Sequence, residues 1–197
     1  MQAVKIFRGL ILRIKRINSE KTIMKRRIEY LIRKLKLKKH SEGGYFAEIF
    51  RSQEMLKNSI LPKRHSGQRS LYTFIYYLLF GNKFSAFHRL KSDEIWHFYE
   101  GTRLLIHILE NKQKLVTIKL GGNLSKGDTF TARIKSGYWF AAEVENKESF
   151  SLVGCTVTPG FDFDDFEFGD KGKLIRNFPN HKKIIEKLAM DLSSDSK

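Results

Sequence analysis

The stretch His88-Arg-Leu-Lys-Ser-Asp-Glu94-Ile-Trp96-His97-Phe-Tyr-Glu-Gly101 places two imidazoles, several carboxylates and an indole between apolar runs typical of strands. Successive side chains of a strand point to opposite faces, so Glu94 and Trp96 share one face while His97 points to the other. If the first face lines a barrel, it brings a carboxylate and an indole close to the imidazole of His88. The rest of the chain is expected to be the scaffold of that site.

Length and composition favour one globular domain. The chain has 197 residues, of which 41% are hydrophobic, enough for an ordinary core. The longest apolar run, 71–80, is about half of what a bilayer-spanning helix needs, so no transmembrane segment is expected. Cys155 is the single cysteine, which excludes an intramolecular disulfide and favours the reducing cytoplasm.

The positive charge is concentrated at the N-terminus. Of a formal net charge of +16, residues 1–39 carry 14 Lys and Arg against 2 acidic residues, whereas residues 40–197 carry 23 against 19. A nucleic-acid-binding domain usually shows a basic stripe or a known motif, and residues 40–197 show neither. We therefore expect no nucleic-acid binding through the domain.

Residues 1–25 are predicted to form a basic amphipathic extension. Apolar residues recur from Val4 to Ile17 at steps of three and four, with Lys and Arg between them. Such a segment could contact a membrane surface or a polyanion, or serve as an organellar presequence. The plainer alternatives are a solvated extension without a role and a translation start at Met24.

Residues 26–190 are predicted to form the folded domain, and residues 191–197 a disordered tail. A helix with Ile28, Leu31, Ile32 and Leu35 on one face should precede the strands. Residues 53–68 suggest a mobile surface loop. The turn signal Gly81-Asn82 suggests that 70–80 and 83–90 form a hairpin.

The remaining chain reads as many short strands followed by a helix. Turn residues separate short β-prone runs from residue 104 to residue 157, a pattern typical of a sandwich or barrel. The segment 161–168 alternates Phe with acidic residues, which suggests an edge segment that packs its Phe side chains inward. A short C-terminal helix is expected over residues 179–190.

Three segments of the chain resemble the cupins, and in particular a small single-domain cupin family of unassigned function. They are His40-Ser-Glu-Gly-Gly-Tyr-Phe46, Phe87-His-Arg-Leu-Lys-Ser-Asp-Glu-Ile-Trp-His-Phe-Tyr99 and Gly154-Cys-Thr-Val-Thr-Pro-Gly-Phe-Asp-Phe163. The resemblance implies an all-β fold, a double-stranded β-helix jelly roll with a ligand pocket inside the barrel. It also implies a distant similarity to deoxysugar epimerases and a common tendency to dimerise.

The chain departs from the cupin pattern at its metal ligands. By the resemblance, a cupin metal is held by three His and one Glu, and here only His88 and Glu94 remain, because Leu90 and Phe140 stand at the other two positions. A catalytic metal generally needs three converging protein ligands. We expect neither a metal nor another cofactor.

Two residues are candidates for catalysis and six for ligand binding. An imidazole oriented by a carboxylate can act as a general base, which makes His88 and Glu94 the catalytic candidates. The plainer interpretation is a core histidine bonded to Glu94, which only satisfies buried polar groups. The candidates for ligand binding are Tyr45, Glu48, Arg51, Tyr76, Trp96 and Trp139.

These observations predict a cupin that binds a small polar metabolite, sugar-like or nucleotide-like, inside its barrel, with isomerase or epimerase chemistry as the favoured reaction. The alternative is a non-catalytic binding or interaction module that retains the fold. A homodimer is expected, because a sheet edge must be covered and the strand 45–52 has bulky residues on both faces.

Overall fold

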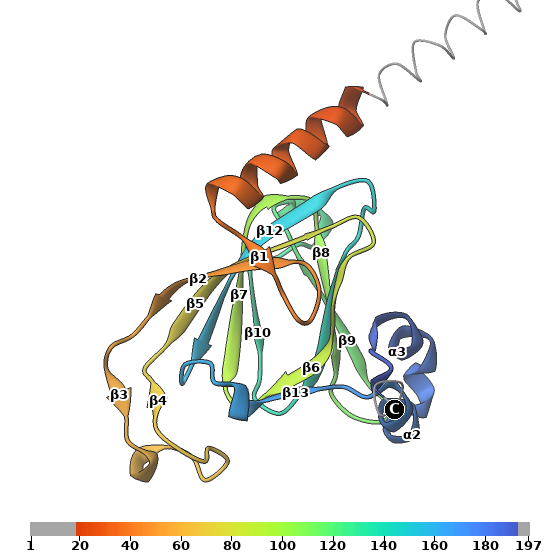
Figure 1. The fold of residues 1–197 in the computed structure, drawn as a ribbon. Coiled ribbons are helices and arrows are strands. Elements are labelled where there is room, and N and C mark those ends of the chain that lie inside the picture. Colours follow the sequence, from red (N-terminus) through yellow and green to blue (C-terminus); the bar gives the residue numbers. More distant parts are fainter. Residues whose placement is uncertain (1–18, 193–197) are drawn as a thin grey trace, which may run out of the picture.

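The computed structural model describes residues 19–192, which form two antiparallel sheets packed face to face (Figure 1). The first sheet has the spatial order β1 (Lys38–Lys39), β2 (Tyr45–Arg51), β5 (Thr73–Phe80), β12 (Phe150–Thr158), β7 (Asp93–Gly101) and β10 (Thr131–Ile134). The second has the order β13 (Phe166–Phe168), β6 (Phe84–Leu90), β11 (Trp139–Val144), β8 (Leu104–Leu109) and β9 (Leu115–Leu120). The all-β jelly-roll prediction is confirmed.

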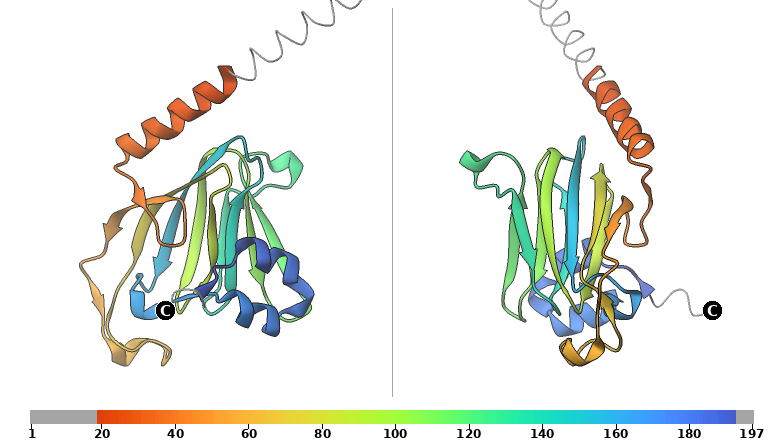
Figure 2. Two further views of the ribbon diagram at one scale, coloured as in Figure 1. Left: turned by 45° about the vertical axis from the view of Figure 1, so that its right-hand side comes forward. Right: turned by 90° about the vertical axis from the view of Figure 1, so that its left-hand side faces the viewer.

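Helices lie at the margins of the two sheets and pack on part of their outer faces (Figures 1 and 2). A helix over residues 19–34 precedes the strands, while α2 (Lys171–Asn177) and α3 (Lys182–Leu188) follow them. Four short 3-10 turns complete the described chain: η1 (Asn58–Ile60), η2 (Leu124–Lys126), η3 (Phe163–Asp165) and η4 (Pro179–His181). The C-terminal helix was expected, and α2 was not.

The main core lies between the two sheets. Its largest buried side chains include Trp96, Tyr77 and Phe140, each 2% exposed or less, which pack with aliphatic residues of both sheets. Burying one such aromatic side chain contributes roughly 1.5–3 kcal/mol. The inward faces of β5, β7, β11 and β12 therefore hold the sandwich together.

Two further apolar clusters join the helices to the sheets. Leu31 is 4% exposed and packs with Leu78 and Leu152 on the outer face of the six-stranded sheet, where Ile28, Ile32 and Leu35 join them. The apolar face predicted for this helix is therefore the one that is buried. On the other sheet, Leu174 of α2 and Ile185 of α3 pack against Phe87.

The hairpin predicted around Gly81-Asn82 is wrong. Strand β5 belongs to the six-stranded sheet and β6 to the five-stranded sheet, so the chain crosses between the sheets at this turn. Gly81 adopts a φ of +60°, as the turn signal indicated, but the two strands diverge after it. The crossing places His88 of β6 opposite the strands that carry the rest of the site.

The segment 53–68, predicted as a loop, contains ordered structure. Strand β3 (Met55–Leu56) pairs with β4 (Arg69–Ser70), and η1 lies between them. His65 and Arg69 at the end of this segment are 4% exposed, and both donate to the carboxylate of Asp165. These buried polar bonds tie the segment to the barrel, which the polar composition of the sequence did not indicate.

The segment 161–168 lies at a sheet edge, as predicted, because β13 is the outermost strand beside β6. The inward packing of its Phe side chains is only partly correct. Phe161, Phe166 and Phe168 are half-buried, whereas Phe163 is 76% exposed at the mouth of a cavity. The buried side chain of this segment is instead Asp165.

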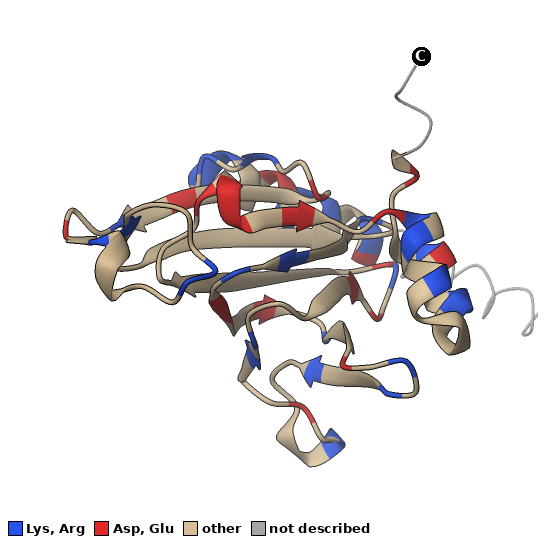
Figure 3. Ribbon diagram, turned by 90° about the horizontal axis from the view of Figure 1, so that it is seen from below, with Lys and Arg blue, Asp and Glu red and all other residues tan. Residues whose placement is uncertain are grey.

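The predicted boundary between the extension and the domain, at residues 25–26, falls within the continuous helix over residues 19–34. Residues 1–18 of the predicted extension and residues 193–197 of the predicted tail lie outside the described residues. None of the helices in residues 19–192 is long and apolar enough to cross a membrane. Figure 3 shows basic and acidic positions interspersed over the barrel.

Candidate functional site

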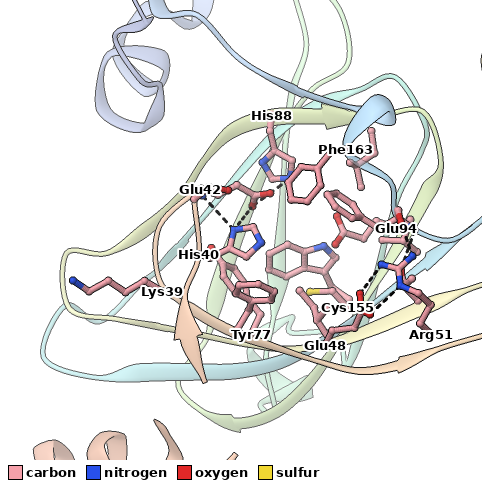
Figure 4. A pocket seen from close by; sticks show the side chains of 18 residues that line it. Lys39, His40, Glu42, Glu48, Arg51, Tyr77, His88, Glu94, Cys155 and Phe163 are labelled. Atoms are coloured by element: carbon pink, nitrogen blue, oxygen red, sulfur yellow. Dashed lines mark hydrogen bonds and ion pairs between the residues drawn. The ribbon is translucent and has the colours of Figure 1, made fainter. Parts of the chain in front are cut away.

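A cavity of about 460 Å³ lies between the two sheets of the barrel. Its walls come from the loop that joins β1 to β2, from strands β2, β5, β6, β7 and β12, and from Phe161 and Phe163 at the start of the edge segment. Figure 4 shows His40, Glu42 and His88 grouped on one side and the Glu48–Arg51 pair on another. Most of the wall is apolar, so these few polar groups determine what the cavity can hold.

His88 presents a basic nitrogen to this cavity. Its Nδ1 lies 2.7 Å from the carbonyl oxygen of Ala86, which can only accept, so the proton of the neutral ring is on Nδ1. Burial lowers the pKa of His88 to about 4, although the Ala86 bond opposes this effect. At neutral pH the ring is therefore uncharged, and Nε2 carries a free electron pair.

Glu42 is the carboxyl group nearest to that nitrogen. Its Oε2 lies 3.6 Å from Nε2 of His88 and accepts a hydrogen bond of 2.8 Å from the hydroxyl of Ser85. Burial raises the pKa of Glu42, while the nearby His40 and the Ser85 bond oppose the increase. When ionised, Glu42 would stabilise a positive charge that forms on His88, because its Oε2 lies 3.6 Å from Nε2.

The loop geometry of the glycine pair places Glu42 there. Gly43 and Gly44 have φ values of +113° and +68°, which favour glycine. A Cβ on Gly43 would lie 2.1 Å from the backbone oxygen of Phe84, so the loop can approach β6 this closely only without a side chain. The His-Ser-Glu-Gly-Gly motif thus serves to insert a carboxyl group into the barrel.

Glu94 and Trp96 project into the same cavity from β7, as strand parity predicted. They are 6% and 1% exposed. Burial raises the pKa of Glu94 to about 8, and the Glu42 carboxyl adds to the increase. Glu94 is therefore mostly protonated at neutral pH. It does not pair with His88 as the plainer interpretation supposed, since His88 has Ala86 and Glu42 as its neighbours.

Glu48 and Arg51 line the cavity side by side because of a bulge. Three residues apart on one strand, they would point to opposite faces, but the register of β2 against β5 shifts between Glu48 and Phe50. The guanidinium of Arg51 donates two bonds of 2.9 and 2.6 Å to the Glu48 carboxylate, and one of 3.0 Å to the carbonyl oxygen of Phe161. The Glu48–Arg51 pair therefore connects β2 to the edge segment 161–168.

Three of the predicted ligand-binding residues lie outside the cavity. Tyr45 stacks on Phe80 on the outer face of the six-stranded sheet, and Tyr76 lies on the same outer face against Tyr99. Trp139 points out of the barrel toward the C-terminal helices, with the Arg89 guanidinium 4.5 Å from its ring. Strand parity explains each placement, because Phe46, Tyr77 and Phe140 beside them point inward.

The residues at the cupin metal position do not fit a metal. Phe140 packs its ring 4.1 Å from the ring of His88, and Leu90 adds an apolar wall. Nδ1 of His88 is engaged by Ala86. Within residues 19–192 no group of three or more His, Cys, Asp or Glu side chains has the geometry to hold a metal ion. At this position the barrel therefore has a packed, mostly apolar wall around His88.

Sequence reasoning missed His40, Glu42 and Tyr77. Tyr77 lines the cavity and donates a hydrogen bond of 2.8 Å to the carbonyl oxygen of Gly43, so it holds the glycine loop in place. The signal for Glu42 was present in the sequence, since an acidic residue directly before a glycine pair lies in a sharp turn. The direction in which that turn folds depends on its contact with β6, which the sequence does not show.

The fold is a jelly roll with a mostly apolar cavity between its two sheets, and the few polar groups of that cavity lie at separate points of its wall. The model of the family described as "Cupin superfamily (DUF985)" matches residues 29–169, and the chain belongs to this family.

Several proteins are similar to this chain over most of its length. Uncharacterized protein YML079W of Saccharomyces cerevisiae is 28% identical over 159 residues, which cover 72% of this chain and 74% of the yeast protein. A solved hypothetical protein from Leishmania major is 30% identical with a TM-score of 0.75, over 83% of this chain and 98% of that one. Protein SO0799 from Shewanella oneidensis is 35% identical with a TM-score of 0.72, over 82% of this chain and 96% of that one.

Proposed function

We propose that this protein binds a small polar metabolite, sugar-like or nucleotide-like, in the barrel cavity and acts on it as an isomerase or epimerase through proton transfer at His88. One observation carries the proposal: His88 is held with Nε2 unprotonated in a cavity of about 460 Å³, with Glu42 3.6 Å from that nitrogen. This is the arrangement of a general base with a nearby carboxyl group to stabilise it.

The cavity walls support a ligand of mixed character. Phe46, Phe161 and Phe163 of the cavity wall supply flat apolar surfaces, on which the ring of a sugar or a base can stack. Polar groups at separate points of the wall, including Glu42 and Glu94, supply hydrogen bonds to hydroxyl or carbonyl groups. A wholly apolar ligand would leave these groups unsatisfied, at about 1–3 kcal/mol each.

The test is a binding screen followed by a proton-exchange measurement. Sugars, sugar phosphates and nucleotides are screened by thermal shift, and each compound that stabilises the protein is incubated with it in D₂O. Proton NMR should show enzyme-dependent loss of one carbon-bound proton signal. His88→Gln should still bind the compound but should lose the exchange by a factor of at least about 100, the range of general-base catalysis.

His97→Gln is the matched control, because His97 lies on β7 but points to the opposite face. It should exchange the proton as the wild type does. Binding without exchange in the wild type would overturn the enzymatic part of the proposal and leave a binding module. A screen in which no compound stabilises the protein would overturn the proposal as a whole.

A further inference from the structure

Two polar atoms of the cavity wall have no partner. Among residues 19–192, seven buried side-chain polar atoms form no hydrogen bond, and two of them, Oε2 of Glu94 and Nε1 of Trp96, belong to the same strand and line the same cavity. Buried polar groups are normally paired, so two unpaired atoms on residues of a cavity wall are candidates for hydrogen bonds to a ligand. The two side chains are two residues apart and therefore lie on one face of β7.

We propose that Glu94 and Trp96 together bind one oxygen of the ligand, a carbonyl oxygen that gains negative charge during the reaction. The substrate class is then a carbonyl compound with an acidic C–H bond next to its carbonyl group, such as a keto sugar. This inference rests on the proposed function, because it assumes the proton transfer at His88, and it adds which group the substrate must carry.

The surroundings make both groups hydrogen-bond donors. The indole N–H of Trp96 can only donate. Burial raises the pKa of Glu94 to about 8, so at neutral pH its carboxyl group carries a proton that it can also donate. The Trp96 and Cys155 side chains lie beside the Glu94 carboxyl group and partly oppose this increase in its pKa.

A carboxyl group kept neutral by apolar surroundings is an effective donor to a developing oxyanion. Ile75, Leu90 and Val157 line the cavity with Glu94 and supply such surroundings. In a site from which water is largely excluded, each fixed donor stabilises the charge more than it would in water. An ionised Glu94 would instead repel the same oxygen.

The chemical step is balanced without another reactant. The C–H bond next to the carbonyl breaks, and its proton goes to Nε2 of His88. The electron pair of that bond forms a C=C bond, and the carbonyl π pair moves onto the oxygen held by Glu94 and Trp96. Return of the proton from the imidazolium to carbon, with the electron pair moving back, restores the neutral ring and the carbonyl group, which completes one cycle of enolisation and ketonisation.

Asp165 shows how a structural carboxylate is held in this protein. It is also buried, but its oxygens accept from Arg69 at 2.7 and 2.8 Å and from His65 at 2.9 Å, which keeps its pKa below the usual value. The pKa of Glu94 is raised, whereas the pKa of Asp165 is lowered. The contrast favours a ligand-binding role for Glu94 over a role in holding the barrel together.

The experiment uses 4-nitrophenol, whose phenolate oxygen stands in for an enolate oxygen and whose ionisation is visible by absorbance. The chain has two tryptophans, and Trp139 lies outside the cavity, so an ¹⁵N-labelled protein gives one indole signal inside the site and one internal control. Titration with the phenol should move the Trp96 indole N–H signal downfield and leave that of Trp139 unchanged. An unmoved Trp96 signal at saturation would overturn the proposal.

Two variants of Glu94 test whether the site needs the hydrogen-bond donor of this side chain or its carboxyl group. Glu94→Leu removes the donor and should weaken phenolate binding by about tenfold to a hundredfold, the range for one hydrogen bond to a charged group. Glu94→Gln keeps an N–H donor and should bind within a few-fold of the wild type. Equal phenolate affinity for wild type and Glu94→Leu would contradict the inference.

The result also separates this inference from the proposed function. Phenolate bound at Trp96, with no metabolite exchanging a proton, would retain the oxyanion site and reject the reaction. Proton exchange that depends on His88 but persists in Glu94→Leu would retain the reaction and reject the oxyanion site.

Discussion

Glu94 holds its proton more tightly in the folded protein than in the unfolded chain, because its folded-state pKa of about 8 lies above the usual 4.5. Its contribution to stability is therefore fully present below pH 4.5 and is lost as the pH rises through 8. His88 acts in the opposite sense, since its pKa falls from 6.5 to about 4 and its contribution is lost as the pH falls through that range.

We predict that the wild type loses stability relative to Glu94→Gln as the pH rises from about 5 to 8, by roughly 1.4 kcal/mol per pH unit at most. The glutamine cannot ionise, and His88 is present in both proteins, so its effect largely cancels in the difference. Urea unfolding at several pH values measures this quantity. A constant difference across the range would show that Glu94 is not protonated in the folded state.

Asp165 connects three segments around the cavity mouth. Its carboxylate accepts hydrogen bonds from Arg69 and His65, which belong to the segment that includes β3 and β4. Its backbone oxygen accepts a hydrogen bond from the backbone N–H of Lys91, after β6. Asp165 itself lies in the edge segment 161–168, at the end of η3. Burial raises the pKa of Asp165, but the Arg69 and His65 bonds outweigh this and leave it lowered.

We expect Asp165→Asn to cost about 3 kcal/mol of stability, because it leaves the 4%-exposed Arg69 without a buried counter-charge. The urea midpoint should fall, and amide hydrogen exchange should increase in residues 53–70 more than in the sandwich strands. Asp164→Asn is a control in the same segment, since Asp164 is exposed. Equal stability of the Asp165 variant and the control would contradict a structural role for Asp165.

The helix over residues 19–34 stabilises the barrel through its last turns. Leu31 is 4% exposed, whereas Ile23 is 63% exposed. Met24 is the first described residue that packs with the apolar cluster on the sheet.

We predict that Leu31→Ala destabilises the protein by about 2–5 kcal/mol, while removal of residues 1–23 changes its melting temperature little. Differential scanning calorimetry of both proteins tests this. An unfolded truncated protein would show that the first 23 residues also pack on the domain.

At the scale of strands, the inward face of β7 could be predicted because its sequence alternates between polar and apolar residues. Glu94 and Trp96 were placed correctly for that reason. Strand β5 gave no such signal, since helix and sheet bury both of its faces. Tyr76, which we expected to bind a ligand, lies on the outer face, and its neighbour Tyr77 points inward. Arg51 reached the cavity only through a bulge, which spacing along the chain does not reveal.

The sheet pairing of β6 and the position of Glu42 could not be predicted either. Both depend on contacts between residues far apart in the sequence: the crossing at Gly81 and the approach of Gly43 to Phe84. The β-rich class and the barrel followed from motifs and turn spacing. That Glu42 is the carboxyl group nearest to His88 could not be predicted, because it depends on these long-range contacts.

At the scale of the whole molecule, the helix leaves part of the six-stranded sheet uncovered. Phe50 and Tyr99 are 59% and 47% exposed on this outer face, and their neighbours Phe74 and Tyr76 link them in one aromatic row. Exposed apolar patches of this kind are typical of interfaces. The homodimer that the sequence led us to expect would cover this patch.

We therefore predict a homodimer that buries this aromatic row. Light scattering should give the mass of two chains at micromolar concentration, and Phe50→Glu with Tyr99→Glu should give that of one chain. Leu124→Glu, at a 57%-exposed apolar position in η2, is the matched control and should remain dimeric. A monomeric wild type would contradict the prediction.

We propose that the cavity keeps its polar groups for a ligand at some cost in stability. The most direct measurement is the free energy of unfolding of Glu94→Leu at neutral pH, compared with that of the wild type. We predict equal or higher stability, because Oε2 of Glu94 has no partner to lose. A loss of about 2 kcal/mol or more, the cost expected when one member of a buried pair is removed, would show that Glu94 supports the fold and would contradict the account.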